Sequence, residues 1–315
     1  MLENFLQPAV MISLIGGMIR IVVPILYAAL GELVVERSGI LNLSVEGGLT
    51  IGAFVGFAVA RETSLPWLGV ICAGLAGSIL TLIMGFLVIT LKQDQTISGL
   101  TLNLFSAGLS FYIYRVLYRS FVGGGMPTVT PFHEVPVPFL SKIPIIGPSI
   151  FSQHMLSYIA LIMVPILYFF LYRTKYGLIL RCCGENPRTV DFKGLNVGTI
   201  QYLALLFGGF MAGIGGCCLV LTSAGMFLDG IASGRGWVAI ALVIFGAWRP
   251  WPILAAGLFY AFLDSLQNQL QSIGFTLIPY QFVAMLPYVV TILVLFISRK
   301  RSGAPMSLGV PYLRE

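Results

Sequence analysis

The sequence predicts an all-α integral membrane protein, a polytopic bundle of about nine transmembrane helices with broken or re-entrant segments, eight and ten being the alternatives. Of the 315 residues, 57% are hydrophobic and 10% charged, with a mean hydropathy of +0.94. A soluble domain carries about 25% charged residues. Apolar runs recur along the chain, and residues 173–197 between two of them hold 5 of the 18 basic residues: Arg173, Lys175, Arg181, Arg188 and Lys193. Such a base-rich loop is typical of the cytoplasmic side of a membrane protein.

The first apolar run contains Arg20, which we expect at an interface or facing the protein interior, because a charge at mid-bilayer is costly. Residues 31–48, GELVVERSGILNLSVEGG, then break the membrane pattern. Asn42 or Ser44 can cap a new helix and leave Glu46 in its first turn, where the helix dipole favours an acid. Irregular backbone at this position is tolerated only against protein or a water-filled cavity.

Three of the apolar runs carry small residues at intervals of four. These are Gly52, Gly56 and Ala60 in 49–60; Ala73, Gly77, Thr81 and Gly85 in 67–91; and Gly209, Gly213 and Cys217 in 200–221. Small residues on one helix face let two helices approach closely within a bilayer. We therefore predict that these faces are packing surfaces.

Two further spans carry polar side chains on one face. The span at about 100–120 places Asn103, Ser106 and Ser110 at spacings of three and four. The span at 253–272 places Asp264, Gln267, Asn268 and Gln271 at i, i+3, i+4 and i+7. Amides are poorly placed against lipid, so these stripes should face other helices or a pathway. The predicted pathway residues are Asn42, Glu46, Asn103, Ser106, Asp264, Gln267 and Asn268; interhelical hydrogen bonding near the outer surface is the alternative for the last stripe.

Residues 121–154 hold six prolines and both histidines, and predict an irregular loop, with surface histidines, on the side opposite to 173–197. Later, TSAGMFLDGIASGRG at 222–236 breaks the membrane pattern a second time. The apolar pattern then resumes for only about twelve residues, which indicates a half-helix or re-entrant element. The two breaks, at 31–48 and 222–236, fall at similar places in the two halves, a pattern typical of transporters with a pathway between repeats.

The basic loop at 173–197 also contains a short helix. Asn186 can serve as its N-cap, Pro187 suits its first turn, and Gly194 can close it. A capped helix of about two turns is too short to span a membrane. It is either a docking element for another protein or a solvated loop with one helical turn. The cluster Arg299, Lys300 and Arg301 predicts a cytoplasmic C-terminus.

Several kinds of chemistry have no motif in the sequence. GxxxxGK[ST] is missing, so we expect no ATP site in this chain. GxSxG, HExxH and paired metal ligands are missing as well, which disfavours an enzyme, a metal site or a resident cofactor. The net charge of +6 is explained by bases kept in the cytoplasm and requires no nucleic acid. The five cysteines lack CxxC spacing and predict reduced thiols.

Five segments, in order, carry a family resemblance: ERSGILNLSVEGG, SGLTLNL, GENPRTVDFKGLNV, GRGWVAIALVIFGAW and the ending LGVPYLRE. They resemble permease subunits of ABC importers of the branched-chain amino acid and ribose type, and within these the nucleoside and simple-sugar subgroup. Over residues 1–315 the resemblance implies a single transmembrane permease domain. It also implies that residues 184–194 contain a coupling helix for the ATPase, with Gly184, Glu185, Asn186, Pro187, Arg188, Asp191 and Gly194 as its residues.

The resemblance further implies the partners and the location of the chain. The partners are an ATPase subunit that holds ATP and magnesium, a second, non-identical permease and an extracytoplasmic solute-binding lipoprotein. The location is the plasma (inner) membrane of a prokaryote. We expect a neutral polar solute, because amides and hydroxyls match sugar hydroxyls and base edges; the choice of a nucleoside is what the subgroup resemblance implies. A simple sugar such as ribose, or an ATP-independent secondary transporter or channel, are the alternatives.

Overall fold

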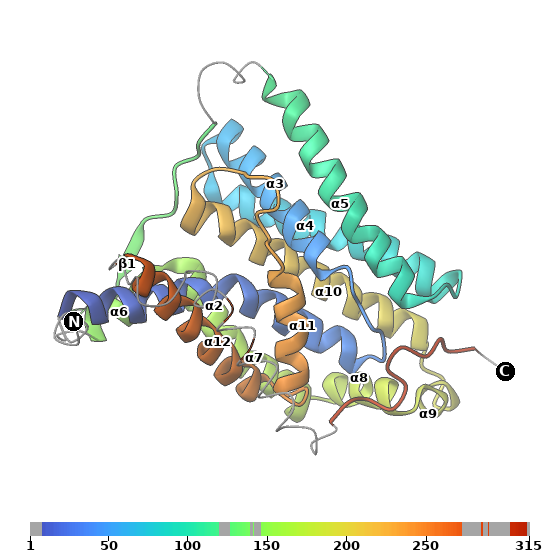
Figure 1. Ribbon diagram of the computed structural model, residues 1–315. Helices are drawn as coiled ribbons and strands as arrows, with labels where there is room; N and C mark the ends of the chain where they lie inside the picture. Colours follow the sequence, from blue (N-terminus) through green and yellow to red (C-terminus); the bar gives the residue numbers. More distant parts are fainter. Residues whose placement is uncertain are drawn as a thin grey trace.

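The helices of the protein were located in a computed structural model that describes residues 8–119, 127–138, 141, 146–272, 285, 289 and 303–313. The described chain is helical apart from connections and one small sheet (Figure 1). Its α-helices are α2 Pro8–Arg37, α3 Val45–Thr63, α4 Pro66–Gly85, α5 Gln95–Leu117, α6 Ile146–Ile150, α7 Met155–Arg173, α8 Lys175–Glu185, α9 Pro187–Phe192, α10 Val197–Cys218, α11 Arg235–Phe245 and α12 Pro250–Ser272. Two π-helical turns, η1 Phe86–Thr90 and η4 Leu219–Ala224, extend α4 and α10.

Among the described residues, five helical segments are long and apolar enough to cross a membrane: Val10–Arg37, Pro66–Thr90, Gln95–Leu117, Met155–Arg173 and Val197–Ala224. Helices α3 and α12 have similar lengths and more polar sequences, while α11 has only 11 residues, as expected for a half-helix. The protein is therefore a multi-pass helical membrane protein. The expected span at 281–298 and the basic cluster at 299–301 lie outside the described residues, apart from positions 285 and 289.

Helix α10 is the centre of the bundle, between α2, α3 and α4 (Figure 1). The small faces predicted from the sequence meet along it. A Cβ added to Gly52 would lie 2.3 Å from the carbonyl oxygen of Gly213, and one added to Gly77 would lie 2.1 Å from that of Gly209. These contacts are backbone to backbone, so a larger residue would separate the helices. The prediction that these faces are packing surfaces is confirmed.

The first predicted break proves narrower than 31–48. Helix α2 continues to Arg37, through Glu32 and Glu36, each only 1% exposed. The carboxylates do not end the helix because each accepts hydrogen bonds from elsewhere in the fold: Glu32 from Asn42, and Glu36 from the indole of Trp248. The irregular backbone is limited to residues 38–44.

Residues 127–138, 141 and 146–154, here called the hairpin side, have more regular structure than the irregular loop that was predicted. Strands β1 (Glu134–Pro136) and β2 (Ser152–His154) pair antiparallel, and Arg20 of α2 forms an ion pair with Glu134. Arg20 is thus at the edge of the bundle, as predicted. His154 is buried, so its expected surface position is wrong: β2 leads it directly into the bundle at the start of α7. Burial, aided by the nearby Arg20, lowers the pKa of His154 below its usual value.

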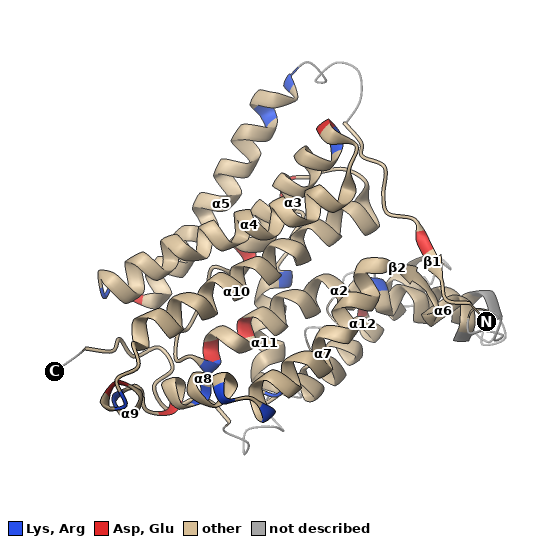
Figure 2. Ribbon diagram, turned by 180° about the vertical axis from the view of Figure 1, so that it is seen from behind, with Lys and Arg blue, Asp and Glu red and all other residues tan. Residues whose placement is uncertain are grey.

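The opposite end of α2 meets the basic loop, which folds into α8 and α9. Figure 2 shows basic residues gathered around these two helices. Arg37 at the end of α2 lies 3.9 Å from Glu185, whereas Arg20 contacts the hairpin side. Seventeen residues of helix separate the two arginines, about 25 Å at 1.5 Å per residue. The hairpin side and the basic loop are therefore at opposite ends of the bundle.

Candidate functional site

Glu46 joins the two broken stretches of the chain. It lies in the first turn of α3, as predicted, and its Oε1 accepts a hydrogen bond from the backbone N–H of Gly234 at 2.7 Å. Its Oε2 accepts one from the N–H of Gly236 at 2.6 Å. These amides open α11, so the carboxylate occupies the positive end of that helix dipole. The breaks at 38–44 and 225–234 therefore meet at one point, which we call the Glu46 junction.

Two glycines make this approach sterically accessible. Gly234 has a φ of +82°, a backbone conformation that favours glycine, and it turns the chain into α11. A Cβ added to Gly236 would lie 2.5 Å from the backbone nitrogen of Glu46. A side chain at Gly236 would therefore push α11 away from α3.

Asn103 of α5 holds the other side of the junction. Its Oδ1 accepts from the N–H of Gly47, and its Nδ2 donates to the carbonyl of Leu43, both at 2.7 Å. One amide thus satisfies a donor and an acceptor that the broken backbone leaves free. Ser106 and Ser110 on the same face of α5 are buried, and their hydroxyls have no hydrogen-bond partner among the described residues.

Ser44, one of the two candidates that the sequence offered, occupies the N-cap position of α3, but its side chain accepts no capping hydrogen bond. Asn42 instead orders the irregular backbone before the helix. Its Oδ1 accepts from the N–H and the hydroxyl of Ser44, at 3.1 and 2.6 Å. Its own N–H and Nδ2 donate to Glu32, at 3.2 and 3.0 Å. Glu32 was not predicted as a site residue. Its spacing of four from Glu36 could have shown that both lie on one face of a continuing helix.

The structure brings together four of the seven predicted pathway residues: Asn42, Glu46, Asn103 and Ser106. Gln267 and Asn268 of α12 are separate from them, because α12 packs against α2, α7 and α11 while α5 packs mainly against α3. Asp264 lies close enough to Arg235, at the start of α11, to interact with its charge. Helix α11 lies between α5 and α12 in both views (Figures 1 and 2). Asp264 and Gln267 are half-buried, whereas Asn268 is exposed. The stripe on α12 is therefore only partly turned towards other helices.

A cavity of about 330 Å³ lies between α2, η4 and the start of α11, near the end of α2 that contacts the hairpin side. Arg20 and Arg235 contribute its charge and Ser223 a hydroxyl. Both arginines are engaged: Arg20 with Glu134, and Arg235 Nη1 with the carbonyls of Ile231 and Ala232 at 3.1 and 3.4 Å. Arg235 was not predicted as a site residue, although a charged residue between two glycines at the second break could have indicated one.

The second group of predicted site residues lies in the basic loop. The side chain of Asn186 accepts from the N–H of Thr189 at 3.3 Å, Pro187 occupies the first turn of α9, and Gly194 has a φ of +77°. The predicted cap, proline and glycine arrangement is confirmed. The loop also contains α8, which was not predicted from the sequence. The residue that could have indicated its start is Thr174, whose hydroxyl caps the helix by accepting from the N–H of Gly177 at 3.1 Å. At the end of α9, Phe192 is 89% exposed.

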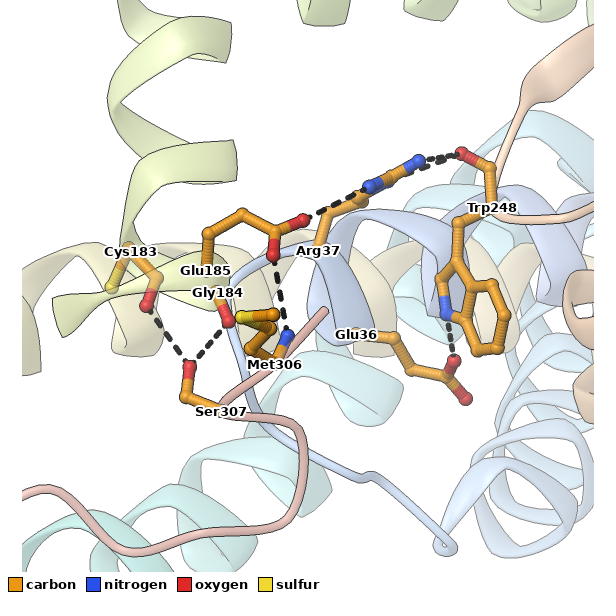
Figure 3. A network of polar contacts seen from close by, with 8 residues as sticks. All are labelled: Glu36, Arg37, Cys183, Gly184, Glu185, Trp248, Met306 and Ser307. Atoms are coloured by element: carbon orange, nitrogen blue, oxygen red, sulfur yellow. Dashed lines mark hydrogen bonds and ion pairs between the residues drawn. The ribbon is translucent and has the colours of Figure 1, made fainter. Parts of the chain in front are cut away.

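A polar network connects the basic loop to the interior of the bundle (Figure 3). Glu185 faces Arg37, whose Nε and Nη2 donate to the carbonyl of Trp248 at 3.1 and 2.8 Å. The indole of Trp248 in turn donates to Glu36. This network, which sequence reasoning did not predict, joins α8, the end of α2 and the turn after α11.

The chemistry available at these sites is hydrogen bonding and helix-dipole electrostatics. In the part of the chain that the structure describes, no three His, Cys, Asp or Glu side chains are grouped to hold a metal ion. Several spans, a half-helix that starts within the bundle against a carboxylate, and a capped loop helix at one end together define a membrane transport subunit.

The family is shown by comparison with known proteins. Residues 13–296 match the family described as the branched-chain amino acid transport system permease component, and the chain belongs to this family. It is an ABC transporter permease and is not itself an enzyme; this class excludes the alternative of an ATP-independent carrier or channel.

The names of the relatives refer to two classes of substrate, sugars and nucleosides. The chain is 37% identical to the putative glucose ABC transporter permease protein TsgC13 of Haloferax volcanii, over 85% of this chain and 80% of the relative. It is 34% identical to the guanosine ABC transporter permease protein NupQ of Bacillus subtilis, over 92% and 93%. It is 30% identical to the nucleoside ABC transporter permease protein NupC of Lactococcus lactis, over 96% and 97%. Haloferax volcanii and Bacillus subtilis each have a second, less similar match, TsgB13 and NupP. No solved structure matches the chain.

Proposed function

We propose that this chain is one of two permease subunits of an ATP-driven importer, and that the imported solute is a nucleoside. The observation that carries the proposal is the Glu46 junction, where two breaks in the helical pattern meet within the bundle and are joined by side-chain hydrogen bonds. Such a junction can open without unfolding a helix. A simple sugar is the second candidate, because the relative with 37% identity is named as a putative glucose permease.

A neutral solute agrees with the charges of the described interior. Each arginine beside the 330 Å³ cavity has an acid close by: Arg20 pairs with Glu134, and Arg235 interacts with the charge of Asp264. The cavity therefore offers no excess positive charge to a phosphate or carboxylate. The polar groups with remaining capacity are the hydroxyls of Ser106 and Ser110 and the second amide proton of Asn103. Hydroxyls and amides of this kind suit sugar hydroxyls and base edges.

The coupling mechanism follows from the network around Arg37. In the proposed cycle, α9 docks on an ATPase subunit, and closure of the ATPase dimer displaces α9 and α8. Glu185 and Arg37 transmit this displacement to the ends of α2 and α11. Because α11 begins on Glu46, the displacement reaches the junction and alternates access to it. Here residues 184–194 transmit force and do not contact the solute.

The other partners and the orientation follow the same scheme. The second permease is a different chain, as the paired matches NupQ with NupP and TsgC13 with TsgB13 suggest. The basic loop faces the cytoplasm of a prokaryotic cell, together with residues 303–313, which contact it. The hairpin side faces outward and receives a solute-binding lipoprotein.

Uptake of labelled guanosine, uridine, ribose and glucose tests the substrate. It is measured in cells with and without the gene, beside a strain whose ATPase subunit is inactive. Saturable uptake of the nucleosides that requires both gene and ATPase is the expected result. Uptake confined to glucose or ribose would favour the second candidate, and uptake confined to an anion or an amino acid would contradict both.

Accessibility tests the orientation. Thr128 is exposed on the hairpin side, so the variant Thr128→Cys should react with a membrane-impermeant maleimide added to intact cells. Labelling only after permeabilisation would show that the hairpin side faces the cytoplasm.

A further inference from the structure

The C-terminal segment, residues 303–313, lies directly on the basic loop. The N–H of Ser307 donates to the carbonyl of Gly184 at 2.9 Å, and the hydroxyl of Tyr312 donates to Oδ2 of Asp191 at 2.9 Å. Two further hydrogen bonds attach the segment to the bundle. The N–H of Gly309 donates to the carbonyl of Gly39 at 3.1 Å, and Nζ of Lys92 donates to the carbonyl of Tyr312 at 2.8 Å. The segment is thus attached both to α9 and to the irregular residues before α3.

A groove of about 470 Å³ separates the C-terminal segment from the start of α9. One wall is formed by Asn186, Pro187 and Arg188, and the other by Val310 and Leu313, with Met306 at its edge. The loop thus contributes mainly polar side chains to the groove, and the C-terminal segment contributes apolar side chains together with Ser307 and Tyr312.

Apolar side chains are exposed around this groove. Met306 is 87% exposed, Val310 59% and Leu313 65%, beside Phe192 at 89%. Gathered apolar groups at a water-exposed site indicate an interaction surface. Charged residues of both signs, Arg188 and Asp191, share the groove region, and this mixture suits a protein surface better than the interior of a lipid layer.

Helix α9 alone is too small for a stable interface. Its six residues extend about 9 Å. Specific protein interfaces bury roughly 800 Å² on each partner. The C-terminal segment roughly doubles the length of chain presented beside α9 and adds the apolar anchors that interfaces require at their centre.

We propose that the docking surface for the ATPase subunit is composite, formed by α9 together with residues 306–313, and that a segment of the ATPase occupies the groove between them. This inference rests on the proposed function, because it assumes that α9 docks on the ATPase. The contact between Gly309 and Gly39 then provides a second route for ATPase motion, directly to the residues before α3.

Site-specific photocrosslinking in the assembled transporter tests the proposal. The photoreactive residue benzoylphenylalanine replaces Phe192, Met306, Val310 or, as a control, Ile79, which is 60% exposed in the middle of α4. We expect crosslinks to the ATPase from Phe192, Met306 and Val310, and none from Ile79. Crosslinks from Phe192 without any from Met306 and Val310 would overturn the composite surface and leave the proposed function intact. No crosslink to the ATPase from any position would contradict the docking of α9 itself, and crosslinks of Met306 and Val310 to lipid alone would assign the segment to the membrane surface.

A charge placed in the groove provides the second measurement. The variant Val310→Asp should weaken binding of the ATPase to the purified permease about tenfold, equivalent to about 1.4 kcal/mol. The matched control is Leu65→Asp, an exposed apolar residue before α4 at the opposite end, which should bind as the native chain does. Equal binding by both variants would overturn the composite surface. The amount of each permease recovered from the membrane separates this result from a loss of folding.

Discussion

The Glu46 junction and the basic loop satisfy the same physical requirement in different ways. Both contain helix ends whose backbone groups lack helical partners. In the basic loop the caps are local: Asn186 bonds to Thr189, and Asn196 bonds to Thr199. At the junction they are distant in sequence: Glu46 bonds to Gly234 and Gly236, 188 and 190 residues away.

This difference indicates how each region behaves. The caps of α8 and α9 lie within the loop itself, so they are kept if the loop shifts against the bundle as a unit. The distant caps at the junction exist only while α3, α5 and α11 are assembled, so separation of these helices removes them together. The loop is therefore suited to transmit force and the junction to change state, and four experiments test this contrast.

The largest effect is expected from Glu46→Ala. It removes the acceptor of two backbone N–H groups at a partly buried helix end, at a cost of about 1–3 kcal/mol for each donor left without a partner. We expect transport to be lost and the thermal unfolding temperature of the purified protein to fall. Glu46→Gln keeps one acceptor and should lie between the native chain and Glu46→Ala. Native stability in both variants would show that the junction is not held by this carboxylate.

A somewhat smaller loss of stability is expected from Asn103→Leu, which removes one hydrogen-bond donor and one acceptor at the junction. We expect a fall in stability of about 1–3 kcal/mol, because Gly47 and Leu43 lose their partner. Asn103→Asp, which retains the acceptor for Gly47, should be less destabilised when unfolding is followed by denaturant titration. If Asn103→Asp proved the more damaging, the bond to Leu43 would be the important one.

In the basic loop, Glu185→Ala and Arg188→Ala should change coupling and leave folding nearly intact. Glu185 is half-exposed and faces Arg37 at 3.9 Å, and exposed ion pairs contribute only about 0–1 kcal/mol. We expect normal amounts of permease in the membrane, with ATP hydrolysis no longer stimulated by solute and uptake strongly reduced. Full transport and a normal ATPase response in both variants would show that the loop is only a solvated connection.

The smallest effect is expected from replacing either of two adjacent native cysteines in α8, Cys182 and Cys183. Cys182 is exposed, whereas Cys183 is buried and its burial raises the pKa of the Cys183 thiol to about 12, so that almost no thiolate exists near pH 7.5. An impermeant maleimide should label inside-out vesicles, and Cys182→Ser should abolish this labelling while Cys183→Ser retains it. Labelling of intact cells at Cys182 would place the basic loop outside and reverse the orientation proposed here.

Much of the fold could be predicted because membrane helices are defined by composition and local spacing. The small-residue faces, the half-helix at 235–245 and the cap at Asn186 all depend on residues within a few positions of one another. The first break was placed too broadly because Glu32 and Glu36 are unfavourable in a bilayer unless they have partners. Their partners, Asn42 and Trp248, are revealed only by the fold.

The sequence by itself determined the class of protein, the family, the main spans, the two breaks and the local caps of the basic loop, because each depends on composition or on neighbouring residues. Only the tertiary structure decided that the two breaks meet at Glu46 and that Asn103 holds the same junction. It also showed that the C-terminal segment lies on α9 and that the α12 stripe is separate from α5. The physical reason is that a hydrogen bond between residues about two hundred positions apart leaves no periodic signal in the chain. It becomes visible only when packing around α10 brings the helices together.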